Sequence, residues 1–143
     1  MDIVLGEWSW MMFDLRKPTV QLLGRWQPWH TGHTALFRKA LEQTGQVCIM
    51  VRDVYNADAG MGNTDNPFEF HDISSEIQWQ LKQHGYEHGM QYMIMQVPNI
   101  VDISYGRGVG YTFTEHDLGE DIHNISATKI RKEMRQNGKL DSI

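Results

Sequence analysis

The sequence contains one cysteine, Cys48, among its 143 residues. A single cysteine cannot form a disulfide within the chain, so a fold held by internal disulfides is excluded. Cys48 lies in an apolar run, which favours a buried thiol in a reducing compartment. No apolar run approaches the roughly 20 residues of a membrane span, and the first ten residues hold no basic leader. We therefore expect a cytoplasmic protein without a membrane partner.

Basic residues are also scarce. The chain has 13 Lys and Arg against 18 Asp and Glu, a net charge of −5. Non-specific nucleic-acid binding needs a basic face, so we expect no nucleic-acid partner, although a local basic pocket remains open. The hydrophobic content of 41% and charged content of 22% are typical of a globular protein. With no repeat or low-complexity tract, this length predicts one domain.

Apolar runs and helical patterns alternate along most of the chain. Because strands joined by helices form right-handed crossovers, this order predicts a mostly parallel sheet in a Rossmann-like three-layer α/β domain. Residues 19–137 form its core, and residues 1–18 form an N-terminal arm or hairpin. Ligands of such sheets bind beyond the carboxyl ends of the strands. The expected strands are 19–25, 46–52 and 91–98, and the expected helices are 33–44, 66–84 (Asn66 as cap, Pro67 in the first turn) and 126–136.

Three segments fit this alternation less well. The N-terminal arm is rich in aromatic residues, and it either adds a strand to the core or forms a contact between copies of the chain. The loop 53–65 is rich in Gly, Asn and Asp and is either a lid or a surface loop, and its spacing does not match a calcium-binding loop. Residues 99–122 are irregular and contain at most a short strand or turn.

The stretch "GRWQPWHTGH" (24–33) joins the end of the first strand to the start of the first helix. A helix N-terminus at the carboxyl edge of a sheet favours anions, and Gly32 lets a phosphate approach the backbone. The histidines His30 and His33 have three interpretations: surface residues beside core tryptophans, a phosphate-handling catalytic pair, or two zinc ligands. Zinc would need two more ligands, and the sequence has no CxxC.

A second anion site is expected at "ISATKIR" (125–131). The hydroxyls of Ser126 and Thr128 stand at the start of the last predicted helix, and Lys129 and Arg131 follow within its first turns. Hydroxyls, free amides and a guanidinium at a helix N-terminus can hold a polyphosphate. Alone, the same pattern also fits an ordinary capped, basic surface helix.

Together the two stretches resemble the nucleotidylyltransferase superfamily. Its members carry H-x-G-H near the N-terminus, matched by His30 to His33, and an S/T-x-T-x-x-R motif near the C-terminus, matched by Ser126 to Arg131. The longer "GRWQPWHTGH" and the helix start "DNPFEF" are similar to the nicotinamide-mononucleotide adenylyltransferase branch. The resemblance spans residues 19–136. It implies a Rossmann-like fold and transfer of a nucleoside monophosphate from a triphosphate to an acceptor, with Mg²⁺ bound to the triphosphate and pyrophosphate released.

The resemblance also implies roles for individual residues. His30, His33 and Arg131 would be catalytic, with His33 nearest the transferred α-phosphate. We expect Trp26 and Trp29 to pack in the core or the site wall rather than to stack on a base. The nucleotide-binding residues would be Gly24, Arg25, Trp26, Gln27, His30, Gly32, His33, Ser126, Thr128 and Arg131.

The acceptor would be a small, phosphorylated molecule. Arg52 and Arg107 are the candidate acceptor ligands, although Arg107 between glycines also fits a turn. Asp53 would be an outer Mg²⁺ ligand or a loop cap, and no dedicated metal site is expected. The form of the first motif favours ATP as donor, since cytidylyl enzymes usually read G-T-F-D-x-x-H-x-G-H. Two alternatives stay open: a CTP-dependent enzyme, and a nucleotide sensor without turnover. The sequence also leaves open whether the chain forms a homo-oligomer.

Overall fold

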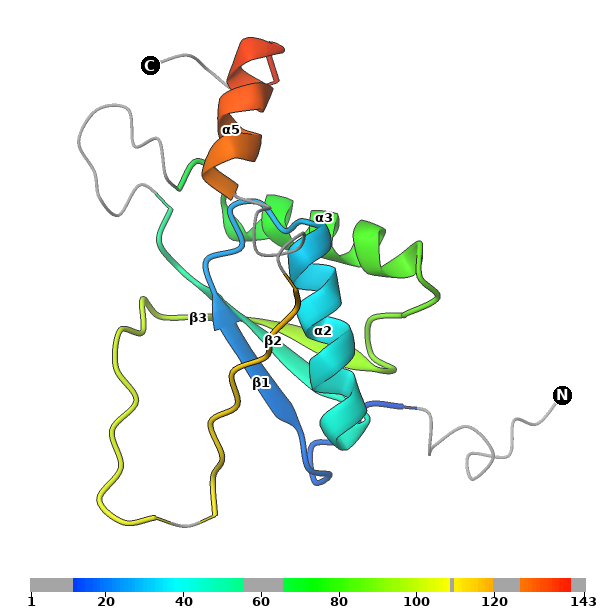
Figure 1. Cartoon of the computed structure of the whole chain (residues 1–143), viewed down its shortest axis with the longest axis vertical. Coiled ribbons are helices and arrows are strands. Elements are labelled where there is room, and N and C mark those ends of the chain that lie inside the picture. The colour runs from blue at the N-terminus through cyan, green and yellow to red at the C-terminus, as the bar shows by residue number, and fades with distance from the viewer. Residues whose placement is uncertain (1–11, 56–65, 109, 120–126, 140–143) are drawn as a thin grey trace, which may run out of the picture.

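The computed structural model describes residues 12–55, 66–108, 110–119 and 127–139. Figure 1 shows the order of the elements along these residues, and all six expected strands and helices are present, with bounds shifted by one to four residues. The expected N-terminal arm, residues 1–18, and the loop 53–65 lie largely outside the described residues. The elements are β1 (Val20–Gly24), α2 (Thr31–Thr44), β2 (Val47–Arg52), α3 (Phe70–Lys82), β3 (Tyr92–Val97) and α5 (Ala127–Gln136).

The three strands form one open parallel sheet in the order β1-β2-β3. Leu22 of β1 pairs with Ile49 of β2, and Ile49 pairs with Ile94 of β3. Each step to the next strand passes through one helix, as the alternating sequence pattern predicts. The chain is therefore α/β with a parallel sheet, which is compatible with a Rossmann-like fold.

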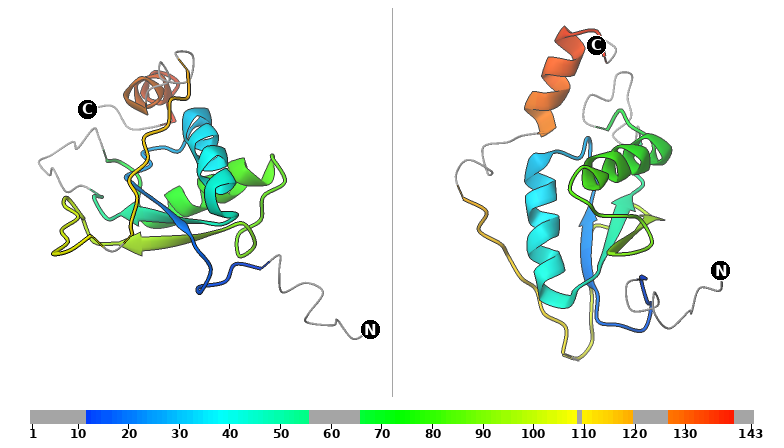
Figure 2. Two further views of the ribbon diagram at one scale, coloured as in Figure 1. Left: turned by 60° about the horizontal axis from the view of Figure 1, so that its bottom comes forward. Right: turned by 90° about the vertical axis from the view of Figure 1, so that its right-hand side faces the viewer.

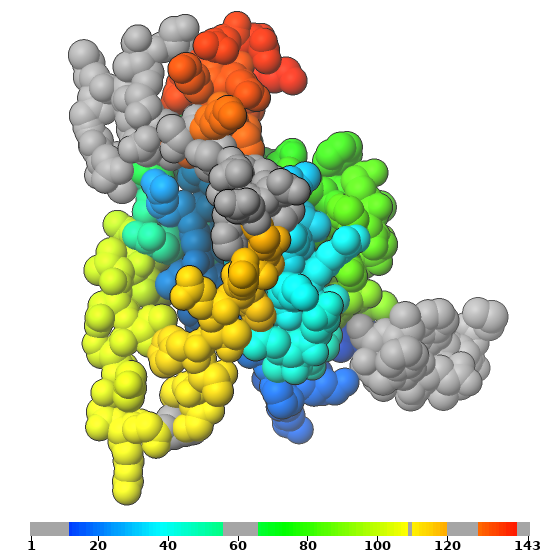
Figure 3. All heavy atoms as spheres, viewed as in Figure 1, coloured from blue at the N-terminus to red at the C-terminus, as the bar shows by residue number. Residues whose placement is uncertain are grey.

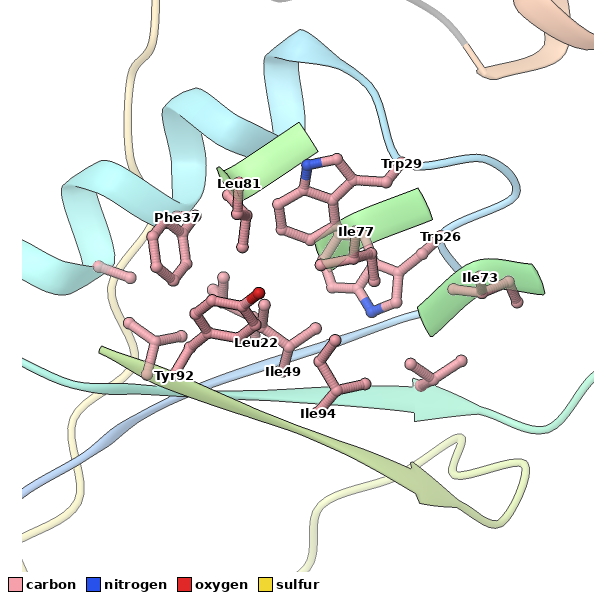
Figure 4. Packing of buried hydrophobic residues seen from close by; sticks show 13 residues of the cluster. Leu22, Trp26, Trp29, Phe37, Ile49, Ile73, Ile77, Leu81, Tyr92 and Ile94 are labelled. Atoms are coloured by element: carbon pink, nitrogen blue, oxygen red, sulfur yellow. The ribbon is translucent and has the colours of Figure 1, made fainter. Parts of the chain in front are cut away.

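Both helices between the strands pack on the same face of the sheet. Phe37 of α2 and Ile77 and Leu81 of α3 are fully buried in one cluster with the inward residues of the strands. Figure 4 shows these side chains pointing from the helices toward Ile49 and Tyr92. The core therefore lies between this face and the two helices.

The second face of the sheet is only partly covered. Cys48 and Met50 are half-buried there, and Met95 is 48% exposed. Cys48 was expected to be fully buried; instead its Sγ contacts the Met95 Sδ at 3.4 Å, and partial burial raises the pKa of the thiol. The predicted third layer is not seen in the described part of the chain, because after β3 the chain forms no further strand or helix before α5.

Residues 98–108 and 110–119 instead run along the outside of the molecule in extended form (Figures 2 and 3). Their return toward α5 passes the C-terminal end of α2, where Gln43 bonds to Thr114 and His116. Several large apolar side chains on this segment are exposed, among them Val101 and Tyr111. The irregular structure expected for this segment is present in its described residues.

Gly24, at the end of β1, is required by a close approach of the Trp26 indole. A Cβ at residue 24 would lie 2.8 Å from two ring carbons of Trp26, which is buried and cannot easily move. We expect Gly24→Ala to destabilise the fold by about 1–3 kcal/mol through overpacking. Chemical denaturation measures the difference, and Gly106→Ala is the control because a Cβ there meets nothing within 4 Å. Equal losses in the two variants would contradict this account of Gly24.

Candidate functional site

The loop between β1 and α2 is held by two tryptophans. Trp26 adopts a left-handed backbone conformation with φ of 53°, and its Nε1 donates to the Met50 carbonyl at 3.1 Å. Trp29 is 1% exposed, and its Nε1 donates to the Thr34 hydroxyl at 2.9 Å. Both indoles are committed to the core and the wall of the site, as expected from the sequence. Any contact of Trp26 with a nucleotide would have to leave these interactions in place.

His30 and His33 cap α2 with their own rings. The His30 Nδ1 accepts a hydrogen bond from the Gly32 N–H at 3.0 Å, and the His33 Nδ1 accepts one from the His30 N–H at 3.1 Å. This reciprocal cap lets α2 begin at Thr31, two residues before the predicted start. It also occupies the amide of Gly32, a buried residue in the first turn that was expected to offer its backbone to a phosphate.

The cap fixes the tautomer of both rings. Because each Nδ1 accepts a hydrogen bond, the proton of each neutral ring lies on Nε2. The rings of His30 and His33 are stacked, with centroids 3.6 Å apart and planes 20° from parallel. Within the described residues neither Nε2 has a hydrogen-bond partner, and neither is a buried unsatisfied atom. The pair thus presents two adjacent N–H donors.

Both histidines are held in the neutral form. Burial, together with a smaller effect of the neighbouring His30, lowers the pKa of His33 to about 3. Burial alone lowers the pKa of His30. Around His33, the Trp26 and Trp29 rings have centroids at 4.8 and 5.4 Å, so an aromatic wall excludes water from it. The site therefore donates hydrogen bonds without carrying charge on its imidazoles.

Gln27 ties this loop to the start of α3. Its side-chain amide donates to the Phe68 carbonyl and accepts from the Phe68 N–H, both at 2.9 Å, and Gln27 is 3% exposed. The segment before α3 is thereby held extended. The side chain of Gln27 is thus committed inside the protein and is not available for the predicted nucleotide contact.

The predicted cap of α3 is wrong. Asn66 was expected to cap a helix beginning at Pro67, but α3 begins at Phe70 after Glu69, which makes no side-chain cap. Asn66 is 2% exposed, and its Oδ1 accepts a hydrogen bond from the Arg25 Nη1 at 3.1 Å. The two hydrogen bonds between Gln27 and Phe68 hold residues 66–69 outside the helix. For this reason α3 begins later than the sequence predicts.

Arg131 brings α5 to the same loop. Its Nη1 donates to the Gln27 carbonyl at 2.5 Å, and the residue is 2% exposed. Figure 1 shows α5 standing above the loop that follows β1. Lys129 is exposed near the start of α5. Ser126 lies outside the described residues, and so does the side chain of Thr128, so the predicted hydroxyl cluster is not described.

A cleft of about 1350 Å³ opens beside His30. Its walls come from the 26–31 loop, from α3 and from α5, and they include Trp29, Trp79 of α3, and Ile130 and Met134 of α5. Trp79 is 62% exposed, which is unusual for so large an apolar side chain and which the sequence pattern did not single out. His30 is therefore the catalytic candidate that borders open space, while His33 lies behind it.

The arginines expected to bind an acceptor lie apart from this cleft. Arg52, at the end of β2, donates from Nη2 to the Asn99 Oδ1 at 2.8 Å. Arg107 is exposed on the segment between β3 and α5 and does not line the cleft. Asp53 is exposed directly after β2. Sequence reasoning missed Asn66 and Asn99 as arginine partners; Asn99 closely follows the end of β3, whereas Asn66 lies in a pattern that predicts a helix cap.

Within residues 12–55, 66–108, 110–119 and 127–139, no group of three or more His, Cys, Asp or Glu side chains could hold a metal ion. None of the helices described is both long enough and apolar enough to cross a membrane. Comparison with models of known families and with curated proteins gives no match to this chain.

The low pKa of His33 makes stability depend on pH. Above pH 6.5 the His33 ring is neutral in both the folded and the unfolded protein. Below pH 6.5 the ring gains a proton in the unfolded protein but stays neutral in the folded protein, where its pKa is about 3. The stability that the neutral ring provides is therefore lost as pH falls from 6.5 toward 3. His33→Gln keeps a capping side chain but removes the titration. We expect the unfolding free energies of parent and variant to converge by about 1.5 kcal/mol between pH 6.5 and 5.

Denaturant unfolding at a series of pH values measures this difference. Carboxylates titrate alike in both proteins and cancel in the comparison. Parallel curves for parent and variant over this range would show that His33 is not protected from protonation.

Proposed function

We propose that this protein is a nucleotidylyltransferase that transfers a nucleoside monophosphate from a nucleoside triphosphate, with ATP as the donor, to a small phosphorylated acceptor and releases pyrophosphate. The observation that carries the proposal is the stacked pair of neutral histidines at the start of α2. They lie at the carboxyl edge of a parallel sheet, where ligands of such sheets bind. The resemblance of residues 19–136 to this superfamily supports it.

The histidine pair extends the partial positive charge of the α2 N-terminus toward the cleft. The Gly32 N–H donates to the His30 Nδ1, which polarises the ring and strengthens its Nε2–H as a donor. The partial positive charge of the helix end is thus presented one ring farther out, beside the cleft. Because the imidazoles stay neutral, an anion can be bound and released without a change in their protonation.

The reaction requires an in-line attack of an acceptor oxygen on the α-phosphorus, with pyrophosphate leaving. No covalent intermediate with the protein is needed, so the protein positions the groups and stabilises developing charge. His30 donates its Nε2–H to the phosphate oxygens where charge develops, and His33 supports it from behind. Arg131 holds the basic start of α5 against the same loop, which keeps Lys129 and Arg131 on the side of the outer phosphates.

The described residues fit an Mg²⁺ ion carried by the triphosphate. Mg²⁺ bound to substrate phosphates needs only one or two protein carboxylates, and Asp53 is an exposed carboxylate at the end of β2. When bound, the ion neutralises charge on the triphosphate. Asp53 would hold it directly or through water.

His30→Asn separates catalysis from folding. Asparagine caps a helix as histidine does here, but it is shorter and has no Nε2–H to offer the phosphate. We expect turnover to fall on the order of a hundredfold or more, with nucleotide affinity falling much less. Pyrophosphate release and nucleotide titration measure the two quantities. His71→Asn on the exposed side of α3 is the control; equal turnover in His30→Asn and parent would refute the catalytic role.

The donor is tested with matched nucleotides. Arg25-Trp26-Gln27-Pro28 follows the adenylyl form of the motif, so we expect ATP to support faster pyrophosphate release than CTP at equal Mg²⁺ concentration. Melting shifts with each nucleotide give a second readout. A preference for CTP would reverse the choice of donor and leave the histidine chemistry unchanged, whereas nucleotide binding without any pyrophosphate release would make the protein a sensor.

A further inference from the structure

Two arginines follow neighbouring strands at the same edge of the sheet. β1 and β2 pair Gly24 with Val51, so the next residue on each strand is an arginine, Arg25 and Arg52. Neighbouring strands lie about 4.8 Å apart. The backbones of the two arginines are therefore close together at the carboxyl edge, where ligands of parallel sheets bind.

Each of these two guanidinium groups bonds to a neutral side-chain amide. The Arg25 Nη1 donates to the Asn66 Oδ1 at 3.1 Å, and the Arg52 Nη2 donates to the Asn99 Oδ1 at 2.8 Å. Both acceptors are neutral amides. Within the described residues no acidic side chain pairs with either arginine, and Asp53, which follows Arg52, is exposed and unpaired with it. In a chain of net charge −5, two neighbouring arginines are thus oriented but left positively charged.

Arg52 also carries an unsatisfied donor. Its Nε is buried and has no hydrogen-bond partner. A buried donor without an acceptor is destabilising, and native proteins keep few of them. An oxyanion bound to the guanidinium in the usual forked geometry, once the side chain turns toward it, would give Nε the acceptor that it lacks.

We infer that Arg25 and Arg52 bind a phosphate monoester dianion, with Asn66 and Asn99 as positioning residues that orient the guanidinium groups without neutralising them. Two positive charges attract a phosphate dianion more strongly than they attract a singly charged carboxylate. That this anion belongs to the acceptor rests on the proposed function. Arg25 lies in the same β1–α2 loop as His30, and the ring centroid of the next residue, Trp26, is 4.8 Å from that of His33.

This site assigns Arg25 a different role from the one that the motif implies. The resemblance implies that Arg25 binds the triphosphate. Its hydrogen bond to Asn66 and its position beside Arg52 favour a role in a second anion site instead. The exposed Arg107, the other expected acceptor ligand, is not part of it. The two anion sites then separate donor from acceptor: the histidines and α5 hold the triphosphate, and the two strand ends hold the acceptor.

Asn99→Asp is the most informative variant. Aspartate keeps an oxygen for the hydrogen bond to Arg52, so a purely structural role of Asn99 survives the change. It also adds a negative charge that neutralises the guanidinium and repels an anion. The two roles therefore predict opposite results for anion binding, and Asn99 is exposed, so the fold tolerates the substitution.

The experiment titrates inorganic phosphate and acetate into the protein by calorimetry at constant ionic strength. A His30→Asn background removes the histidine donor, so that binding at the arginines is measured alone and without turnover. We expect phosphate to bind, acetate to bind at least tenfold more weakly, and Arg25→Gln, Arg52→Gln and Asn99→Asp each to weaken phosphate binding by about tenfold or more. Arg38→Gln, an exposed arginine on α2, is the control and should change it less than twofold. Melting temperatures show that each variant is folded.

Three results would overturn the inference: phosphate binding that survives Arg52→Gln, a folded Asn99→Asp variant that binds phosphate as the parent does, or acetate binding as tight as phosphate. The single variants are also measured without the second substitution. If His30→Asn alone abolishes phosphate binding and Arg52→Gln alone leaves it intact, the anion binds at the histidines only, and the inference is refuted. A protein that binds phosphate at the arginines but releases no pyrophosphate from any nucleotide would refute the proposed function and leave this site standing.

Discussion

The side chain of Gln27 makes the interaction on which the rest of the site depends. Its amide binds the Phe68 backbone on both sides, which holds the loop after β1 against the extended segment before α3. Its own carbonyl accepts the Arg131 guanidinium of α5. The loop that carries His30 is therefore fixed at one end by β1 and in its middle by this amide, and the walls of the cleft follow from it.

The site combines neutral hydrogen-bond donors, which are histidines, with positively charged groups, which are arginines. Burial and the aromatic wall keep His30 and His33 uncharged, so they act through hydrogen bonds and through the field of α2. Positive charge comes instead from the guanidinium groups of arginines. Their side-chain amide partners, Asn66 and Asn99, orient them and leave the charge available. Such a division leaves positive charge at one edge of the sheet in an acidic protein.

The elements could be predicted from the sequence because each is a strong local pattern. Apolar runs gave β1, β2 and β3, and four-residue spacing gave α3. What failed depended on contacts between distant residues: Asn66 reads locally as a helix cap, but it bonds Arg25, 41 residues away. The expected third layer is absent from the described residues, because those between β3 and α5 form neither a strand nor a helix. The histidines were found by motif, but their stacking and their protonation state follow only from the burial of His33.

The bonds around Gln27 also set an order for folding. They link residues separated by 41 and by 104 positions in the chain, and contacts across such distances form late because long loops must close first. The sheet and α2 can form from residues close together in sequence, so the histidine cap arises early. The cleft is completed only when the last helix reaches the loop. A nascent chain would thus carry the capped end of α2 well before it holds the complete cleft, so the cleft would be the last part of the structure to form.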